Sequence, residues 1–202
     1  MKLENDYKSA DISTLLGQNV DDPIELRKFQ SRFRKEIDRK VKNRKCFICK
    51  KECDSFCNSH TIPRFSLLNI SQKGMLFNNF APFDISHIDI KTGVEKTIVF
   101  FSICRQCDGT VFQDYENESK YESEITRIML AEIVLKLKLR NIWMKSREIE
   151  SYKICIDNIP SYVISLRNPI EKKLKAAVYF RRKLENEYFY AKNIINSKAY
   201  SR

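Results

Sequence analysis

Four of the seven cysteines form two Cys-x-x-Cys pairs. Cys46 and Cys49 make the first pair, and Cys104 and Cys107 make the second. This spacing turns both thiols of a pair toward one side of a tight turn, and two such pairs supply the four thiolates of a closed, tetrahedral zinc site. We therefore predict one structural zinc ion bound by these four cysteines.

Two further cysteines follow the first pair closely. Cys53, Cys57 and the nearby His60 have spacings that allow either exchange with the first pair or a second bound ion. We favour a single zinc ion, with Cys53 and Cys57 as reserve ligands. Cys155 stands apart and is predicted to lie in a core. Nothing in the pattern favours a disulfide framework, because the chain shows no secretory signal.

The chain has two histidines, and each follows a serine. His60 comes shortly after the first cysteine pair, and zinc binding would bring it beside the helix expected after Cys104. An imidazole in that place suits a general base or a metal ligand, although packing and hydrogen bonding are common roles for a single histidine. His87, which lies near Asp84 and Asp89, is the reserve candidate.

Carboxylates follow the second cysteine pair. Asp108 comes directly after Cys107, and Glu116 lies roughly two helical turns further on. Both carboxylates would project from similar faces of a helix, and together with an imidazole they suit Mg²⁺ or Mn²⁺. Two structural alternatives remain open, in which Asp108 stabilises a helix start and Glu116 pairs with Arg64 or Arg105.

The positive charge is concentrated at two places in the chain. Lysine and arginine number 37 against 26 acidic residues, which gives a net charge of +11. Residues 27–51 and 136–202 each carry +10, whereas residues 52–107 are balanced. We expect a polyanionic partner, with DNA favoured over RNA, although such helix faces can also be merely solvated. The candidate contacts to the nucleic-acid backbone are Arg27, Lys28, Arg32, Lys35, Arg39 and Lys40.

The composition indicates an ordinary folded protein. Hydrophobic residues make up 43% of the 202 residues, and only 4 glycines and 5 prolines are present, which excludes collagen-like and low-complexity classes. The first residues lack the apolar run of a signal peptide, and no stretch reaches the ~18 apolar residues of a membrane span. We therefore expect a cytoplasmic protein without a membrane partner.

Helices and short strands must position these groups. Asp22, Pro23 and Glu25 form a helix-start signal, and apolar residues then recur at helical spacing, which predicts a basic amphipathic helix over about 22–43. Residues 75–80 and 96–103 are predicted strands because they are apolar and bounded by turns. The next helix is expected to begin at Asp108.

The second half of the chain is predicted to be helical. A long helix is expected over 123–150, and a last helix from the start signal at Asn168 and Pro169 to beyond Ile195. We predict that the core side of the first consists of Ile128, Leu130, Ile133, Val134, Leu137 and Trp143. The expected fold is α+β, with a flexible tail at 1–21, the basic helix at 22–43, a small zinc-binding core at 44–118 and a helical region at 119–202.

The order of these motifs resembles the zinc-containing branch of the HNH endonuclease superfamily. The shared features are a CxxC pair, an SHxIP segment at 59–63, a CxxCD segment at 104–108 and an FxxxE helix at 112–116. The segments SHTIPRFSLLNISQKG and FFSICRQCDGTVFQDYE also look like a group of bacterial proteins with SHxIxK and CxxHDxxxFxxxE segments, in which Cys107 here replaces a histidine. The resemblance spans about 46–118 and implies a treble-clef or ββα-metal core.

The resemblance also implies a metal-dependent phosphodiesterase. In that interpretation His60 activates water, and a divalent ion bound by Asp108 and Glu116 polarises the phosphate. The chain departs from the family pattern at three points, because Ser59 precedes the base, Asp108 replaces a histidine, and the strand at 97–103 has no asparagine. The alternative is a non-catalytic zinc-binding module for nucleic acid or protein, with a protein partner or a second copy at the C-terminal helices.

Overall fold

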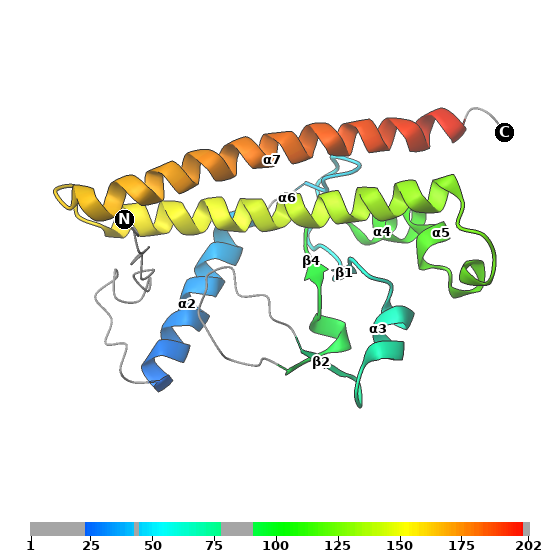
Figure 1. Cartoon of the computed structure of the whole chain (residues 1–202), viewed down its shortest axis with the longest axis horizontal. Helices are drawn as coiled ribbons and strands as arrows, with labels where there is room; N and C mark the ends of the chain where they lie inside the picture. Colours follow the sequence, from blue (N-terminus) through cyan, green and yellow to red (C-terminus); the bar gives the residue numbers. More distant parts are fainter. Residues whose placement is uncertain (1–22, 43–44, 78–90, 200–202) are drawn as a thin grey trace, which may run out of the picture. The chain divides into compact units, whose positions relative to one another are not determined.

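The computed structural model describes residues 23–42, 45–77 and 91–199. Helices predominate in these residues, and the strands form two small two-stranded sheets (Figure 1), which confirms the α+β class. No helix among them combines the length and the apolar composition that crossing a membrane requires. The tail predicted at 1–21 and the reserve candidate His87 lie outside the described residues.

The chain folds as two compact units, each assembled from two stretches of sequence. Unit 1 contains helix α2 (Pro23–Val41) and residues Arg147–Ala177, and unit 2 contains Lys42–Ser146 and the chain from Val178 onward. The long helices α6 (Arg127–Asn158) and α7 (Ile164–Ala199) therefore contribute one part to each unit. This grouping follows contacts in space, whereas the four segments predicted above follow the order of the sequence.

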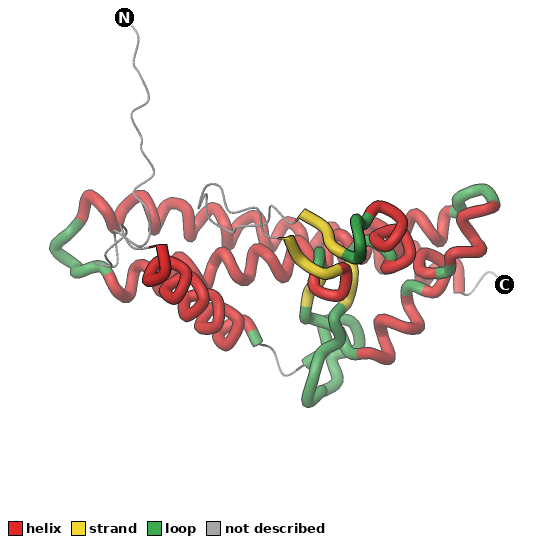
Figure 2. Tube along the Cα trace, turned by 90° about the horizontal axis from the view of Figure 1, so that it is seen from below, coloured by secondary structure: helices red, strands yellow, loops and turns green. Residues whose placement is uncertain are grey.

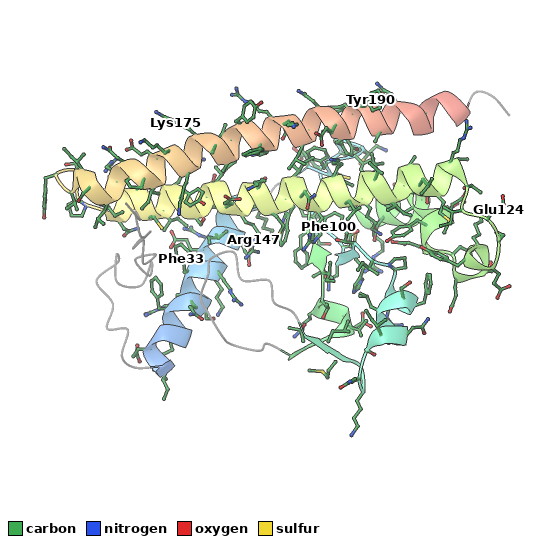
Figure 3. The ribbon with its side chains drawn as sticks, viewed as in Figure 1. Phe33, Phe100, Glu124, Arg147, Lys175 and Tyr190 are labelled. Atoms are coloured by element: carbon green, nitrogen blue, oxygen red, sulfur yellow. The ribbon has the colours of Figure 1, made fainter. Side chains whose placement is uncertain are left out.

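Helix α2 of unit 1 is the basic amphipathic helix that the sequence pattern indicates. On its apolar face Phe29 stacks on Phe33 with ring centroids 5.8 Å apart, and Ile37 is buried. Asp38 forms an ion pair with Arg147 of α6, which Figure 3 labels. Burial raises the pKa of Asp38, and the Arg147 guanidinium opposes this shift. The apolar face and this ion pair hold α2 within unit 1.

Helix α7 begins earlier than its start signal suggests. The structure places its first residue at Ile164, so Asn168 is not an N-cap and Pro169 lies inside the helix. A proline this close to the start removes a single backbone hydrogen bond, which a long helix tolerates. Arg167 also donates to the carbonyl oxygens of Ile156 and Ile159, at 3.5 and 3.4 Å, and so satisfies acceptors at the C-terminal end of α6.

Unit 2 contains all the described strands, and each is short (Figure 2). Strand β1 (Ser59–His60) pairs antiparallel with β4 (Val99–Phe100), and β2 (Met75–Phe77) pairs antiparallel with β3 (Lys91–Gly93). Short helical elements connect or follow them: α3 (Arg64–Ile70), the 3-10 turn η1 (Val94–Lys96), α4 (Arg105–Val111), α5 (Gln113–Glu116) and the 3-10 turn η2 (Glu118–Glu122).

Two predicted elements are corrected here. The strand predicted over 96–103 is reduced to Val99 and Phe100, because Ile98 adopts a left-handed backbone with φ of 55° and interrupts the extended run. The helix expected to begin at Asp108 begins at Arg105, with Cys104 as its N-cap. Of the strand predicted over 75–80, residues 75–77 form β2 and the remainder lies outside the described residues.

The core of unit 2 surrounds the cysteines and lies against the first part of α6 and the last part of α7. Figure 1 shows α6 between α7 and the short helix α4, which agrees with the members of the core. Its fully buried side chains include Phe100 below α6, which Figure 3 labels. The buried members are Cys46, Phe100, Ile103, Cys107, Phe112, Leu135, Leu139, Ile142, Tyr188 and Ala191.

The predicted core side of α6 is wrong for three of its six residues, whereas Ile128 and Ile133 are partly buried and Trp143 packs against the core. Leu130, Val134 and Leu137 are exposed, with 50%, 42% and 41% of their surface accessible, whereas Leu135 and Leu139 are each 1% exposed. Both stripes are apolar and recur at helical spacing, so periodicity alone does not decide between them. Leu135 and Leu139 are the buried residues because they pack in the core that contains Cys46 and Cys107.

We predict that Leu135→Ala lowers the free energy of unfolding of the protein by about 2–5 kcal/mol, because it leaves a cavity in a closed core. Leu137→Ala is the matched control, since it removes the same atoms from an exposed position, and it should cost roughly 1 kcal/mol or less. Urea unfolding followed by circular dichroism measures both. Equal losses for the two variants would contradict this assignment of faces.

Candidate metal centre

The two Cys-x-x-Cys pairs come together in unit 2. Cys46 and Cys49 lie in a turn, and Cys104 and Cys107 lie at the N-cap and in the first turn of α4. The four sulfur atoms all lie within 4.8 Å of one another, and the Sγ atoms of Cys49 and Cys104 are 4.0 Å apart. The structure thus places these four predicted ligands in one group.

This arrangement fits a tetrahedral zinc ion. Four sulfur atoms at ~2.3 Å from such an ion lie about 3.8 Å from one another, close to the observed spacing. A full set of four thiolates leaves no open position for water or substrate, which is typical of structural zinc sites. These four cysteines could therefore hold a metal such as zinc.

Backbone groups shape the site around the sulfur atoms. The Cys104 amide donates to the Cys46 sulfur at 3.3 Å, and the Cys107 amide donates to the Cys104 sulfur at 3.5 Å. Lys50 adopts a left-handed backbone with φ of 63°, which closes the turn after the first pair. A hydrogen bond from the Lys51 backbone is the main reason that the pKa of the Cys49 thiol is lowered to about 7. Burial has the opposite effect on two other ligands and raises the pKa of Cys46 and of Cys107.

Cys53 and Cys57 lie outside the group of four. The Cys53 thiol contacts the Lys51 carbonyl oxygen at 3.7 Å, and the Cys57 thiol donates to the Ile103 carbonyl oxygen at 3.3 Å. Burial, reinforced by the neighbouring Asp108 carboxylate, raises the pKa of Cys57 to about 12. Cys57 is therefore held as a neutral thiol that donates a hydrogen bond. The seventh cysteine, Cys155, is buried in unit 1.

His60 lies on β1, next to the metal centre in sequence but engaged elsewhere. Its Nε2 atom lies 3.1 Å from the carbonyl oxygen of Val94. A carbonyl oxygen only accepts, so Nε2 is the donor in this hydrogen bond. The His60 side chain is partly buried, and its proximity lowers the pKa of Glu116 slightly against the larger effect of burial. His60 and Glu116 therefore lie in the same part of unit 2.

Asp108 and Glu116 both contact one buried lysine that the sequence analysis did not single out. The Lys136 ammonium of α6 lies 3.2 Å from Oδ1 of Asp108 and forms an ion pair with Glu116. Ser59 donates to the same Asp108 oxygen at 2.7 Å. The Lys136 side chain is 0% exposed, and its Nζ lies 4.7 Å from the centroid of the Phe112 ring. Burial raises the pKa of Glu116, and Lys136 is the main opposing influence.

Lys136 occupies the place between the two carboxylates that the sequence analysis gave to a divalent cation. The ammonium supplies the positive charge that these acids need and fills the space between them. Glu116 pairs with Lys136 and not with the predicted partner Arg64, which pairs with Glu95 at 2.6 Å. Asp108 lies in the first turn of α4, whose N-cap is Cys104.

The signal that could have revealed Lys136 is a charged pair within an apolar stripe. Glu132 and Lys136 lie one helical turn apart and are 5% and 0% exposed. Charged residues are almost never buried without a partner. A charged pair within an apolar stripe of α6 therefore predicts partners elsewhere in the chain. Glu132 has one, since it accepts from the Tyr115 amide at 2.7 Å. Tyr115 in turn donates to the Thr61 carbonyl oxygen at 2.9 Å, which links α5 to the residue after β1.

The predicted nucleic-acid contacts lie on α2 in unit 1. Lys28, Arg32, Lys35 and Arg39 recur at intervals of one helical turn, so they form one stripe along the helix, and all four are exposed. Lys40 is exposed beside this stripe, and nothing is described of the Arg27 side chain. Lys28 pairs with Glu25 at 2.8 Å, and Arg39 lies 4.0 Å from Glu36. Surface ion pairs of this kind contribute little to stability.

Comparison with protein-family models, with curated proteins and with solved structures found no match to this chain. Its function is therefore inferred from its own residues and contacts.

We predict that the purified protein contains one zinc ion per chain. Cys49→Ser should lower the zinc content and the stability, because it removes one of the four grouped sulfur atoms. Cys53→Ser is the matched control and should retain zinc, since Cys53 lies outside the group. Inductively coupled plasma mass spectrometry gives the stoichiometry. Two ions in the wild type, or loss of zinc in the Cys53 variant, would count against a single four-cysteine site.

We predict that Lys136→Met destabilises the protein by about 3 kcal/mol, because it leaves the Asp108 and Glu116 carboxylates without their cation. Adding Asp108→Asn and Glu116→Gln to the same variant should restore much of that loss, since no uncompensated charge then remains. Urea unfolding of the two variants makes the comparison. A single variant as stable as the wild type would show that the lysine does not compensate these acids.

Proposed function

We propose that this chain is a nucleic-acid-binding module whose core is stabilised by one zinc ion and which does not hydrolyse its ligand. The zinc ion would be held by Cys46, Cys49, Cys104 and Cys107. The observation that carries the choice of a binding module over an enzyme is Lys136, whose ammonium already pairs with both Asp108 and Glu116. A divalent catalytic ion at those carboxylates would have to displace a fully buried ammonium.

The order of elements in unit 2 supports a treble-clef-like core. A turn with the first cysteine pair comes first, the antiparallel pair β1 and β4 follows, and α4 then supplies the second pair from its N-terminus. In this proposal the zinc ion joins the turn to the helix and takes the place of a larger hydrophobic core. The ion is then structural and performs no step on the ligand.

The basic stripe on α2 supports a nucleic acid as the ligand. From Lys28 to Arg39 the helix rises about 16 Å, so four exposed cations can follow several successive phosphates along one strand. We propose double-stranded DNA, because its major groove and flanking phosphates admit a helix, whereas the deep, narrow major groove of A-form RNA does not. The contacts would be to the backbone and would carry little sequence preference.

The test is the salt dependence of binding to a fluorescein-labelled DNA duplex of mixed sequence, followed by fluorescence anisotropy. The variant combines Lys28→Gln, Arg32→Gln, Lys35→Gln and Arg39→Gln. If each cation neutralises one phosphate, the slope of log K against log salt should become shallower by about 3.6 in this variant.

The matched control removes four exposed cations from α7 instead, by Lys172→Gln, Lys173→Gln, Lys175→Gln and Arg182→Gln. These side chains are exposed, so the net charge falls equally while the α2 stripe is intact. Equal loss of binding in both variants would mean that only net charge matters. Preference for a labelled RNA of the same length would reassign the polymer, and no binding at moderate salt would overturn the proposal.

A second candidate is the metal-dependent endonuclease, and the position of His60 favours it. His60 lies on β1 of a β1, β4 and α4 arrangement, close to Glu116, which is the order of elements that the HNH resemblance implies. Nicking of supercoiled plasmid with Mg²⁺ or Mn²⁺, by wild type and by His60→Ala, separates the two candidates. Cleavage that is lost in the variant while zinc is retained would establish the nuclease, and binding without cleavage supports the module.

A further inference from the structure

The part of α7 that belongs to unit 2 exposes several aromatic side chains. Tyr179 and Tyr190 are 65% and 73% exposed, and Phe180 and Phe189 beside them are also exposed. Tyr179 contacts the Phe180 ring, with centroids 5.6 Å apart, whereas Tyr190, which Figure 3 labels, makes no ring contact or hydrogen bond with any described residue. Large aromatic side chains gathered at one place on a surface are typical of an interaction site.

The two tyrosines belong to one stripe on the face of α7 opposite the core of unit 2. Leu184, Tyr188 and Ala191 pack in or against that core, and the residue two positions after each of them is exposed. Two residues correspond to about 200° around a helix, so the stripe faces away from the core. We call this stripe the α7 platform. Its exposed members recur every three or four residues and are Tyr179, Arg182, Lys183, Asn186, Tyr190 and Asn193.

The α7 platform is positively charged. Arg182 and Lys183 lie between the two tyrosines, and neither forms an ion pair with a described residue. The nearby acids Glu185 and Glu187 are paired with Arg181 and Lys138 instead. Among the described residues of α7 after position 177, no exposed side chain is acidic or aliphatic. The charge favours a polyanion, and the lack of aliphatic side chains disfavours the packing of a second helix, which needs an apolar seam.

We propose that the α7 platform binds single-stranded DNA, with one base stacked on Tyr179, another stacked on Tyr190, and the phosphates between them at Arg182 and Lys183. The two tyrosines lie about 16 Å apart along the helix. Aromatic rings that hold unpaired bases, together with cations that follow the backbone, are the usual means of binding a single strand. In a duplex the base faces are covered by neighbouring pairs, so this site differs from the α2 stripe in its ligand. Only the choice of DNA over RNA rests on the proposed function.

The first test follows the binding of a fluorescein-labelled oligothymidylate of about 12 nucleotides by fluorescence anisotropy. Loss of a ring on which a base stacks commonly lowers affinity by about 5–140-fold. We therefore expect Tyr179→Ala and Tyr190→Ala each to weaken binding at least about fivefold. The matched control is Tyr162→Ala in the turn between α6 and α7, where the side chain is 82% exposed, and it should bind like the wild type. Equal affinities for all four proteins would overturn the proposal.

The salt dependence tests the two cations separately from the rings. A single strand gives a slope of about 0.7 in log K against log salt for each neutralised phosphate, so Arg182→Gln with Lys183→Gln should make the slope shallower by about 1.4. The matched control is Lys172→Gln with Lys173→Gln, which removes the same charge from exposed positions of α7 outside the platform. Equal changes of slope in the two variants would count against a defined path for the strand.

A photocrosslink locates the stacked bases without any substitution. The same strand is prepared with 5-iododeoxyuridine in place of thymidine, irradiated in complex with the wild-type protein, and the crosslinked peptides are identified by mass spectrometry. Because iodouracil crosslinks efficiently to an aromatic ring stacked on it, we expect crosslinks at Tyr179 and Tyr190. Crosslinks confined to residues outside α7 would overturn the proposal.

The outcomes distinguish this proposal from the one for α2. Single-strand binding that depends on the tyrosines, without duplex binding, would overturn the α2 proposal and support this one. Duplex binding, together with single-strand binding that survives both tyrosine substitutions, would overturn this one alone. Tighter tyrosine-dependent binding of an oligouridylate of the same length would overturn the choice of DNA. A dimer that dissociates in Tyr190→Ala, without single-strand binding, would show by sedimentation that a second copy covers the platform instead.

Discussion

The electrostatics of four thiol groups within 4.8 Å of one another constrain all of unit 2. Two thiolates about 4 Å apart repel by about 4 kcal/mol at an effective dielectric constant of 20, and four of them form six such pairs. A divalent cation at their centre reverses the sign of this energy. The secondary structure around them is slight, because β1 and β4 have two residues each and α4 has seven. Such elements depend on a central crosslink, which a metal ion supplies.

A second cation, the ammonium of Lys136, compensates the acids beside this centre. A zinc ion with four thiolates carries a net charge of −2, and Asp108 and Glu116 add two negative charges nearby. With zinc bound, Lys136 would balance only part of this negative charge, and the region around Asp108 would repel a phosphodiester backbone. In the proposed function, the exposed cations of α2 bind the backbone instead. The proposed function thus uses α2 to bind the ligand and the metal centre to support the fold. This separation agrees better with a binding module than with an enzyme.

The features that the sequence predicts well are local in the chain. The Cys-x-x-Cys spacing is a property of four residues, and the start signal and apolar spacing of α2 lie within one helix, so both could be recognised without a structure. The partner of Lys136 could not be predicted from the sequence, because Asp108 comes close to it only through the packing of α4 on α6. The predicted buried face of α6 is wrong at Leu130, Val134 and Leu137 for the same reason, because two apolar stripes are equally periodic and only packing against the cysteine core distinguishes them. Ile98 interrupts a predicted strand through its left-handed backbone. This interruption could not be predicted, because a left-handed conformation at a β-branched residue has no sequence signature.

The division of the chain into units has a consequence for its biosynthesis. The last cysteine of the metal centre is Cys107, whereas the turn of α7 that covers this centre lies about 80 residues later and belongs to the same unit. At a translation rate of about 5–20 residues per second, the ribosome needs roughly 4–16 seconds to add that segment. During this interval the nascent thiols have their full ligand set but lack the Tyr188 side of their enclosure. A metal ion bound by these four cysteines would therefore be enclosed on this side only after the last helix has been synthesised.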